Sequence, residues 1–586
     1  MKTTPNNTLT SRRTIPARLS CYTSIYTLLF VLPLIGAATE LRLPSIFSDH
    51  MILQQKTYNT FWGVGKPGET VSVSASWGAI AKTNVQPDGH WKLFLKTPEA
   101  NTRQSITITS SRTITYENVA IGEVWLCVGQ SNMGWSMGNS FGADQETPTA
   151  NHPHLRIYKS QREHWHEPLA FQRDRLARWQ PCTPESAAET SAVSYYFGKT
   201  LHQNLNIPVG IIVQAFAGTP IEGWMPWEIQ KEDPRAVAHK ASYDENSKRR
   251  ETRGDTVEKA LATFEAELAT YNTKIDRGEI MKNAVRKLSP PIITSPARLG
   301  HQYPAHQFNA MIYPIRPYGI RGAIWYQGER NAKNAPQAEH YTTQLERLIG
   351  YYRRSWHALS GGHVADDFPF QFTQLPSWNP EQSTPVEGIE ASWAVSREAM
   401  RLANRKIPNT GMAVTIDTGD AVGLHPKNKK PIGLRHGYLA LEKTYNQNIT
   451  GCGPRLASHT FIDARCILSF DHTGKGLTAA NPDKPLGGFA IAGEDQIWHW
   501  GRARLRNNTV VVSSPEVNKP VAIRYAWAMN PSRQNLLYNK NGFPASPFRT
   551  DDWPLFDPAA ELVEVHKPKK PDGYIPQDWK RPEMNP

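Results

Sequence analysis

Four short apolar runs constrain most strongly what this chain can fold into. A run that lacks polar alternation is typical of a strand buried on both faces, and such strands occur in parallel sheets covered by helices. Long stretches that can form helices separate the runs, so together they predict an α/β domain. The runs are VWLCV at Val124–Val128, VGIIV at Val209–Val213, GAIWY at Gly322–Tyr326 and MAVTI at Met412–Ile416.

Period-two patterns predict β-rich regions on both sides of this domain. Apolar and polar residues alternate in VSVSAS at Val71–Ser76, and the turn signals KPGE and PDGH lie nearby, which indicates a small sandwich. Beyond residue 500, VVVSS and AIRYAWA again indicate strands. We expect an N-terminal β-sandwich domain at 39–120, the α/β domain at 121–449, a β-rich (sandwich or jelly-roll-like) domain at 450–560 and an extended tail at 561–586.

A helical insertion is expected to interrupt the α/β domain at about 228–290. Asp255 can cap its main helix and Gly278 can end it. An apolar face at helical spacing predicts packing against the rest of the protein rather than a binding site. The residues of this face are Val257, Leu261, Phe264, Leu268, Tyr271 and Ile275.

Residues 1–38 have the features of a secretory signal peptide. Arg12, Arg13 and Arg18 precede the apolar run Tyr26–Ile35, and three small residues follow. The run is too short to span a bilayer comfortably. We therefore expect the mature protein to be secreted or periplasmic, without membrane attachment.

Export to an oxidising compartment would permit disulfides. Cys452 and Cys466 lie close together in the strand-rich C-terminal region and are the candidate pair. No spacing resembles a zinc site, so we expect no metal. The formal net charge of +13 comes from scattered Lys and Arg residues. Without a nucleic-acid-binding motif, this charge does not indicate a nucleic-acid partner.

Polar groups suited to catalysis follow each apolar run, where ligands bind in open α/β sheets. Ser131 in GQSN is a nucleophile if a base activates it, and otherwise a helix cap. Gly218 in AGT can aim a backbone N–H at an oxyanion, and Gln327 in YQGE can donate a second hydrogen bond. Glu329 can orient a histidine, and His425 is the candidate base. Each residue also has a structural interpretation, but the four in order favour a Ser-His hydrolase with an acidic residue and an oxyanion hole.

Longer motifs extend over all four sites: GEVWLCVGQSNM, AGT, NAMIYPI, WYQGERNA and DTGDAVGLHPKNKKPIGLR. They resemble those of the sialate O-acetylesterase-like family of carbohydrate acetylesterases, in the SGNH hydrolase superfamily. The resemblance implies a flavodoxin-like α/β core, with Ser131 as nucleophile and His425 as base. It also implies three oxyanion donors, the N–H groups of Ser131 and Gly218 and the side chain of Gln327, with Asn331 as an alternative donor.

The acidic member of the triad stays open. Many SGNH enzymes carry an Asp three residues before the His, where this chain has Val422. A resemblance to acetyl xylan esterases with a QGE motif implies Glu329, and Asp420 is an equal candidate beside Asp417. A Ser-His dyad steadied by a backbone carbonyl is the remaining alternative.

The predicted function is that of a secreted serine esterase, without a cofactor, that removes O-acetyl groups from carbohydrates through an acyl-serine intermediate. Acetylated sialic acid and plant-type polysaccharides or oligosaccharides are the substrate candidates, and the sequence leaves the oligomeric state open. The alternative is a non-catalytic carbohydrate-binding protein with a decayed esterase core. Aromatic residues near the motifs can stack on sugars or pack in the core. The candidates for substrate contacts are Trp135, Trp224, Trp227 and Trp378, with Asn309 from NAMIYPI and Arg330 from WYQGERNA.

Overall fold

The computed structural model describes residues 40–254, 256–279, 300–576 and 581–586. The expected signal peptide, Asp255 and the end of the expected insertion lie outside these ranges. Among the helices that the structure describes, none has both the length and the apolar character needed to cross a bilayer.

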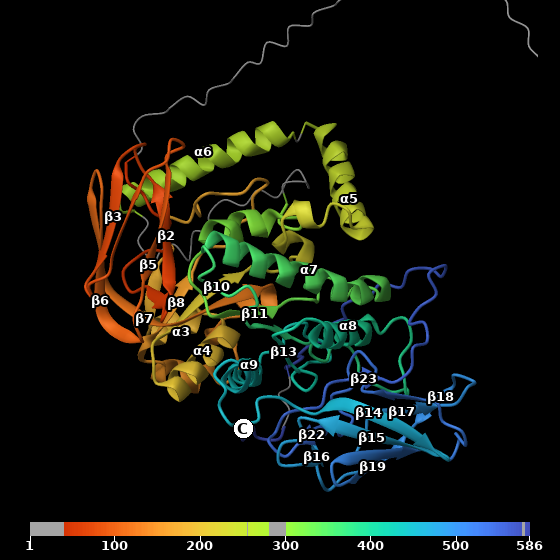
Figure 1. Cartoon of the computed structure of the whole chain (residues 1–586). Coiled ribbons are helices and arrows are strands. Elements are labelled where there is room, and N and C mark those ends of the chain that lie inside the picture. The colour runs from red at the N-terminus through yellow and green to blue at the C-terminus, as the bar shows by residue number, and fades with distance from the viewer. Residues whose placement is uncertain (1–39, 255, 280–299, 577–580) are drawn as a thin grey trace, which may run out of the picture.

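A parallel sheet forms the centre of the molecule (Figure 1). Its strands run in the order β13-β12-β11-β7-β10-β8 with every neighbouring pair parallel, and β9 adds an antiparallel edge. The α/β prediction is thereby confirmed, although β12 (FQFT) was not among the predicted strands. The bounds are β7 Thr113–Gly129, β8 His152–Lys159, β9 Trp179–Cys182, β10 Val209–Ala215, β11 Gly322–Tyr326, β12 Phe370–Thr373 and β13 Thr410–Ala413.

Helices cover both faces of this sheet. Alternate side chains of a strand point to opposite faces, so neighbouring residues of β7 contact different helices. Trp125 and Cys127 of β7 belong to a buried cluster that includes residues of α4 and α9. Val124 and Leu126 belong to another cluster, which includes residues of α7 and α8. The helices are α1 Ser131–Gly134, α2 Ala143–Glu146, α3 Pro184–Glu189, α4 Ala192–Leu205, α5 Pro234–Glu251, α6 Val257–Asp276, α7 Ala335–Leu359, α8 Ser392–Lys406 and α9 Lys430–Lys443.

The expected helix near residue 260 is present as α6. Its N-cap is Thr256, whose hydroxyl accepts a hydrogen bond from the backbone N–H of Lys259 at 3.2 Å. Phe264 packs on Trp165 with ring centroids 5.2 Å apart. The apolar face of α6 is therefore a packing face, as predicted.

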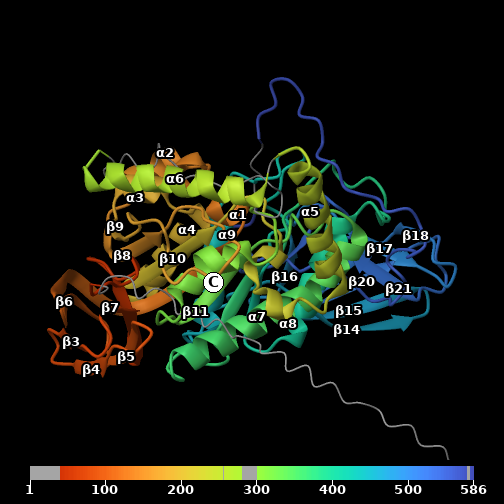
Figure 2. The same cartoon turned by 90° about the horizontal axis from the view of Figure 1, so that it is seen from above.

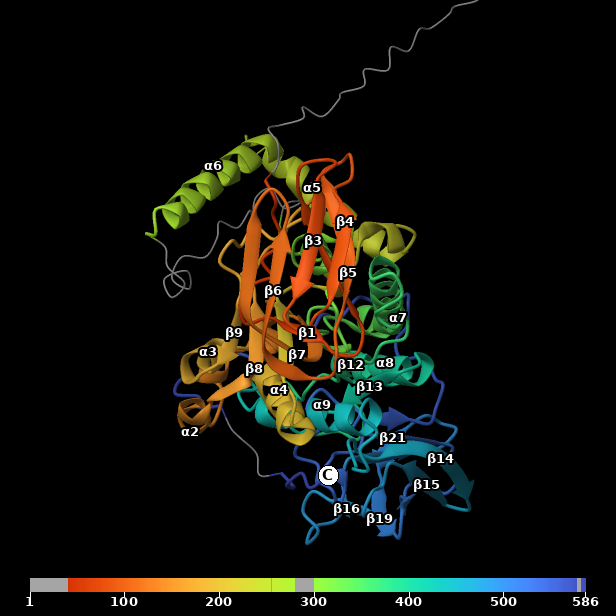
Figure 3. The same cartoon turned by 60° about the vertical axis from the view of Figure 1, so that its left-hand side comes forward.

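The N-terminal strands are joined to the central sheet by one continuous strand, β7. Residues 113–121 of β7 pair with β6, and residues 123–129 pair with β10 in the central sheet. The expected domain boundary after residue 120 thus falls inside a strand. Figure 3 shows the N-terminal strands gathered on one side of the molecule. They are β1 Ile52–Gln54, β2 Tyr58–Val64, β3 Thr70–Ala75, β4 Ile80–Asn84, β5 His90–Lys96 and β6 Asn101–Thr109.

The C-terminal region is β-rich and lies at the opposite end from the N-terminal strands (Figure 2). It contains two four-stranded sheets, β14-β15-β20-β19 and β18-β17-β21-β23, and the pair β16-β22. Arg397 of α8 ties this region to the α/β core, since its buried guanidinium donates to the carbonyls of Leu375, Pro376, Ala528 and Met529. The strands are β14 Arg455–Ile462, β15 Arg465–Asp471, β16 Leu477–Ala479, β17 Phe489–Ala492, β18 Trp498–Trp500, β19 Arg502–Arg506, β20 Thr509–Ser513, β21 Ala522–Tyr525, β22 Leu537–Asn539 and β23 Phe548–Arg549.

The described part of the tail has no helix or strand, but it is attached to the α/β core. The N–H of Val565 donates to the carbonyl of Lys333 at 2.7 Å. The hydroxyl of Tyr574 donates to Asp420, on the loop that follows β13. The tail therefore reaches the part of the chain that carries His425.

Candidate active site

Ser131 lies at a tight turn between β7 and α1. The strand ends at Gly129, and a Cβ atom there would lie 2.1 Å from the carbonyl oxygen of Tyr326, so no larger residue fits. The N–H of Gln130 donates to the same carbonyl at 3.0 Å. The neighbouring strand β11 thus fixes the turn that presents Ser131 as the first residue of a helix.

His425 is hydrogen-bonded to Ser131. Its Nε2 lies 2.8 Å from the Oγ of Ser131, although the two residues are 294 positions apart in the chain. The indole of Trp135 stacks on the imidazole, with ring centroids 5.3 Å apart and planes 27° apart. A hydroxyl in contact with an imidazole is the arrangement that a base-activated nucleophile needs.

The surroundings of His425 favour its neutral form. Burial lowers the pKa of His425 to about 4, and the positive charges of Lys429 and Lys567 contribute in the same direction. Lys567 belongs to the C-terminal tail. A neutral imidazole can accept the Ser131 proton, so this environment keeps the base active at mildly acidic pH.

A buried polar network lies directly behind the pair. Asn132 donates from its amide to the Oε1 of Glu329 and to the carbonyl of Leu424, and its Oδ1 accepts from Lys429. Burial raises the pKa of Glu329 and lowers that of Lys429 to about 7. Because Asn132 follows Ser131 and Leu424 precedes His425, this amide connects the two catalytic candidates.

Asn132 and Lys429 were not among the site residues predicted from the sequence. Both stand inside quoted motifs, GQSN and HPKNKK. Their burial, rather than their type, distinguishes them: each is fully inaccessible to solvent. A buried Lys held by a buried Asn is costly unless it has a role or a partner.

The three candidate carboxylates have partners other than His425, although the Oε2 of Glu329 and the Oδ2 of Asp420 are buried without a hydrogen bond in the described structure. Glu329 accepts from Asn132. Asp420 accepts from the N–H groups of Val422 and Gly423 and from the tail residue Tyr574. Within the described residues, no hydrogen bond joins His425 to a carboxylate, so the geometry present is that of a Ser-His dyad.

Asp417, the further candidate, is also committed to other groups. It forms a bidentate ion pair with Arg435, with distances of 2.6 and 2.7 Å, and accepts from the hydroxyl of Tyr538 at 2.8 Å. Arg435 lowers the pKa of Asp417 to about 2 in spite of its burial. This carboxylate stabilises the contact between α9 and the C-terminal region.

Two of the expected oxyanion donors are backbone groups. Gly218 has a φ of +74°, a left-handed conformation that glycine adopts without strain. Among the described residues, no acceptor is assigned to the N–H of Gly218 or to that of Ser131. Within that part of the chain, both groups are therefore available to an oxyanion.

The expected role of Gln327 is not supported. Its amide donates to the Oδ1 of Asn331 at 2.8 Å, the carbonyl of Thr219 at 3.1 Å and the Oε1 of Gln130 at 3.2 Å. The alternative donor Asn331 is likewise engaged, because its amide donates to Glu222 at 2.9 Å. Both side chains bind neighbouring loops together instead of facing an oxyanion.

The aromatic candidates separate into exposed and core residues. Trp135 is half-buried beside His425 and can contact a substrate. Trp224 is fully buried, donates to the hydroxyl of Thr219 at 2.9 Å and is unable to stack on a sugar, so this prediction is wrong. Trp378 is also buried and packs on Trp393 with ring centroids 4.9 Å apart.

Arg330 and Asn309 are not neighbours, since Arg330 lies near the Gly218 loop and Asn309 lines a separate pocket. Arg330 donates to the Oε1 of Gln302 at 2.8 Å, and the amide of Gln302 donates to the carbonyl of Gly218 at 3.0 Å. Arg330 is thereby close to the Gly218 loop. Asn309 is buried and lines a separate pocket together with Trp227.

The expected Cys452–Cys466 disulfide is absent, and both residues are free thiols. Cys466 is buried in β15 between two flanking strands. The thiol of Cys452 instead donates to Glu442 at 3.9 Å, so the two sulfur atoms have different neighbours. Ligand atoms of Glu442, Cys452 and His472 lie within 4.8 Å of one another, but positive charges of Arg455 and Lys443 act on His472 and oppose a cation there.

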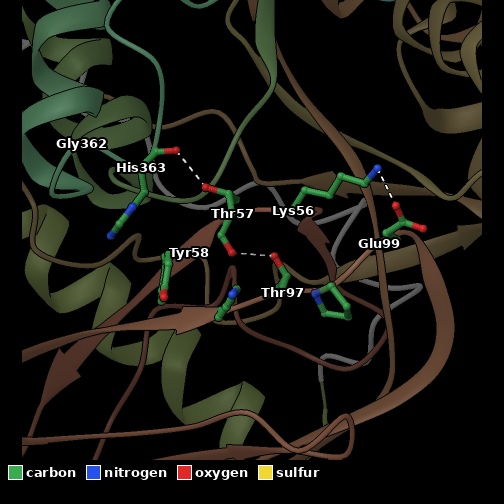
Figure 4. Close-up of a pocket in the computed structure, with 9 residues that line it drawn as sticks. Lys56, Thr57, Tyr58, Thr97, Glu99, Gly362 and His363 are labelled. Carbon is green, nitrogen blue, oxygen red and sulfur yellow. Dashed lines mark hydrogen bonds and ion pairs between the residues drawn. The ribbon is translucent and has the colours of Figure 1, made fainter.

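A pocket of about 720 Å³ lies apart from the predicted site residues, between the N-terminal strands and the end of α7 (Figure 4). The hydroxyl of Thr57 donates to the carbonyl of His363 at 3.0 Å, and Lys56 pairs with Glu99 at 2.7 Å. None of the predicted site residues lines it.

Known proteins are similar to this chain over most of its length. Residues 121–263 and 301–429 match the model of a family described as "Carbohydrate esterase, sialic acid-specific acetylesterase". The chain is 27% identical to a sialate O-acetylesterase of Mus musculus and 29% identical to one of Rattus norvegicus, in each case over 88% of this chain and 95% of the relative. The crystal structure of a carbohydrate acetylesterase from Xanthomonas citri is 28% identical, with a TM-score of 0.70 over 88% of this chain and 100% of that one. The chain belongs to the sialate O-acetylesterase-like family of carbohydrate esterases.

Proposed function

We propose that this protein is a serine esterase that removes O-acetyl groups from carbohydrates. The observation that carries the proposal is the hydrogen bond of 2.8 Å between Ser131 and His425, inside the region that matches the family. The names of the relatives support acetyl esters of carbohydrates as the substrates. The apolar run at residues 26–35 supports export of the mature chain.

A flavodoxin-like core of the SGNH type is part of this proposal. With the edge strands β8 and β9 set aside, the parallel strands β10-β7-β11-β12-β13 follow the chain order 2-1-3-4-5, which is the flavodoxin-like order. Ser131 follows the first of these strands, at its carboxyl end. The helices α5 and α6 are the insertion into this core.

The proposed reaction is a double displacement through an acetyl-serine. The Oγ of Ser131 attacks the acetyl carbonyl carbon while the Nε2 of His425 takes the hydroxyl proton. The tetrahedral intermediate collapses, the sugar oxygen leaves, and it takes that proton from His425. Water then gives a proton to His425 and attacks the acetyl-serine. The second tetrahedral intermediate collapses, the acetyl group leaves as acetic acid, and the Oγ of Ser131 takes the proton back from His425.

The N–H groups of Ser131 and Gly218 are the proposed oxyanion donors. Neither has an assigned acceptor within the described part of the protein. A donor of this kind contributes about 3 kcal/mol to stabilisation of the transition state. Gln327 and Asn331 contribute by fixing the loops around Gly218 instead.

The alternative, a decayed carbohydrate-binding protein, is disfavoured by the same geometry. A decayed site would not be expected to keep a nucleophile, a neutral base and two available N–H groups together. The discriminating experiment is labelling with a serine-reactive fluorophosphonate, which attaches to an activated serine but not to a decayed site.

The test of the function is Ser131→Ala. Acetate release from p-nitrophenyl acetate and from acetylated sialic acid, xylan and xyloglucan is measured for both proteins. We expect the variant to lose at least a thousandfold in kcat. Ser242→Ala, an exposed serine of α5, is the matched control. Full activity in a folded Ser131→Ala protein would refute the proposal.

A further inference from the structure

A second pocket, of about 420 Å³, lies on the insertion side of the α/β core, along the segment 303–309. It is formed by the short helix η4 (Trp227–Ile229), by α5, by the start of α6 and by the segment 303–309. Aromatic and polar side chains line it together. Among them are His166, Trp227, Glu228, Lys240, Tyr303 and Asn309.

The segment 301–303 connects this pocket to the catalytic site. The ring of His301 stacks on Phe216, with centroids 5.1 Å apart, and the amide of Gln302 donates to the carbonyl of Gly218 at 3.0 Å. The next residue, Tyr303, lines the pocket. Gln302 and Tyr303 are consecutive residues, so one short segment both contacts the loop expected to hold the oxyanion and lines the pocket.

The backbone on this side of the pocket is unusual. Ala305 has a φ of +68°, which a residue with a Cβ rarely adopts, and its N–H donates to the carbonyl of Glu222 at 2.9 Å. Phe308–Ile312, which includes Asn309, forms a π-helix, a conformation frequent at functional sites. Both features hold the lining residues in place at some cost in stability.

The chemistry of the lining suits an uncharged sugar ring. Trp227 and Tyr303 are half-buried and offer aromatic rings, and Lys240 lies over both of them. Lys240 is paired with Asp244 at 2.7 Å, so its charge is balanced within the protein. In the described structure the indole N–H of Trp227 has no assigned acceptor and is available to a ligand hydroxyl.

We propose that this pocket binds a sugar unit other than the one that carries the ester under attack. The enzyme then acts on oligosaccharides or polysaccharides in preference to single sugars. This inference rests on the proposed esterase function and adds the chain length of the substrate to it. Trp227 is its specificity-determining residue, through stacking and the indole hydrogen bond.

The test compares substrates of different length. For wild type, kcat/KM is measured on acetylated xylose, acetylated xylotetraose and p-nitrophenyl acetate. We expect the tetramer to be favoured over the monomer by about tenfold, the amount that one aromatic stacking contact supplies. In Trp227→Ala this preference should disappear through a higher KM, and Trp227→Phe should restore part of it.

Two controls separate the outcomes. Trp500→Ala, at a 38% exposed tryptophan of the C-terminal sheets, should keep the wild-type preference. Hydrolysis of p-nitrophenyl acetate should fall less in Trp227→Ala than hydrolysis of the tetramer. A wild type without preference for the tetramer overturns the inference, as does an equal loss on all three substrates. Absence of any acetate release by wild type would instead overturn the esterase function.

Discussion

The low pKa of His425 predicts an esterase that works in mildly acidic solution. Burial and the charges of Lys429 and Lys567 hold this pKa at about 4, compared with 6.5 for an exposed histidine. At pH 5 about 90% of the imidazole is then neutral, whereas about 3% would be neutral at the ordinary pKa. The fraction of His425 that can act as a base at pH 5 should therefore be about 30 times higher than for an unperturbed histidine.

The assay is the pH profile of kcat/KM between pH 3.5 and 8, with released acetate quantified directly. We expect a plateau from pH 7 down to about pH 5 and a half-maximal value near pH 4. Lys567→Gln removes one of the cations and should move the acid limb to higher pH. Lys569→Gln, at an exposed lysine two residues further along the tail, is the matched control.

Acid unfolding must be separated from protonation of the base. The pKa of His425 is lower in the folded than in the unfolded state, so the unfolded state binds more protons between pH 6.5 and 4. This group therefore contributes stability above pH 6.5 that is lost as the pH falls towards 4. Circular dichroism at each pH, and recovery of activity at pH 7, establish that the chain stays folded. A half-maximal rate at pH 6.5 in a folded protein would refute the reasoning.

Three further outcomes follow from the contacts of single residues. Glu329→Gln and Asp420→Asn should each keep more than a tenth of kcat, because neither carboxylate contacts His425. A loss of kcat near 10⁴-fold in either variant would identify that residue as the triad acid. Gly218→Ala should lower the free energy of unfolding, measured in urea, by about 1 kcal/mol. Alanine is strained at a φ of +74°, and no atom blocks its methyl group, so the strain is the whole effect. An unchanged free energy of unfolding would contradict that conformation. Thiol titration of the denatured, unreduced chain should count both Cys452 and Cys466, and a lower count would indicate a disulfide.

The main strands and the contact between Ser131 and His425 were predictable from the sequence because local patterns determine them. Apolar runs buried on two faces require a covered parallel sheet, and the carboxyl ends of parallel strands meet at one edge. Ser131 and His425 each follow such a run, so their contact agrees with the pattern. The strand β12 was missed because four residues, FQFT, give too short a signal.

The errors concern which partner a polar side chain takes. Gln327 has the chemistry of an oxyanion donor, but Asn331 and Thr219 compete for its amide, and these contacts depend on the folding of distant loops. Trp224 has the chemistry of a sugar platform, but it is buried in the core. The residue type predicts which hydrogen bonds or stacking contacts a side chain can form. Only the packing of the folded chain decides whether neighbouring residues already occupy it.

The continuous strand β7 has a consequence for how the protein can be divided. Its 17 residues span about 57 Å, from the N-terminal sheet to the turn that presents Ser131. A cut at residue 120 would sever a hydrogen-bonded ladder instead of a linker, so the N-terminal strands are not a detachable module. Truncation, domain exchange and limited proteolysis should therefore all find that residues 40–129 and the esterase core behave as one cooperative folding unit.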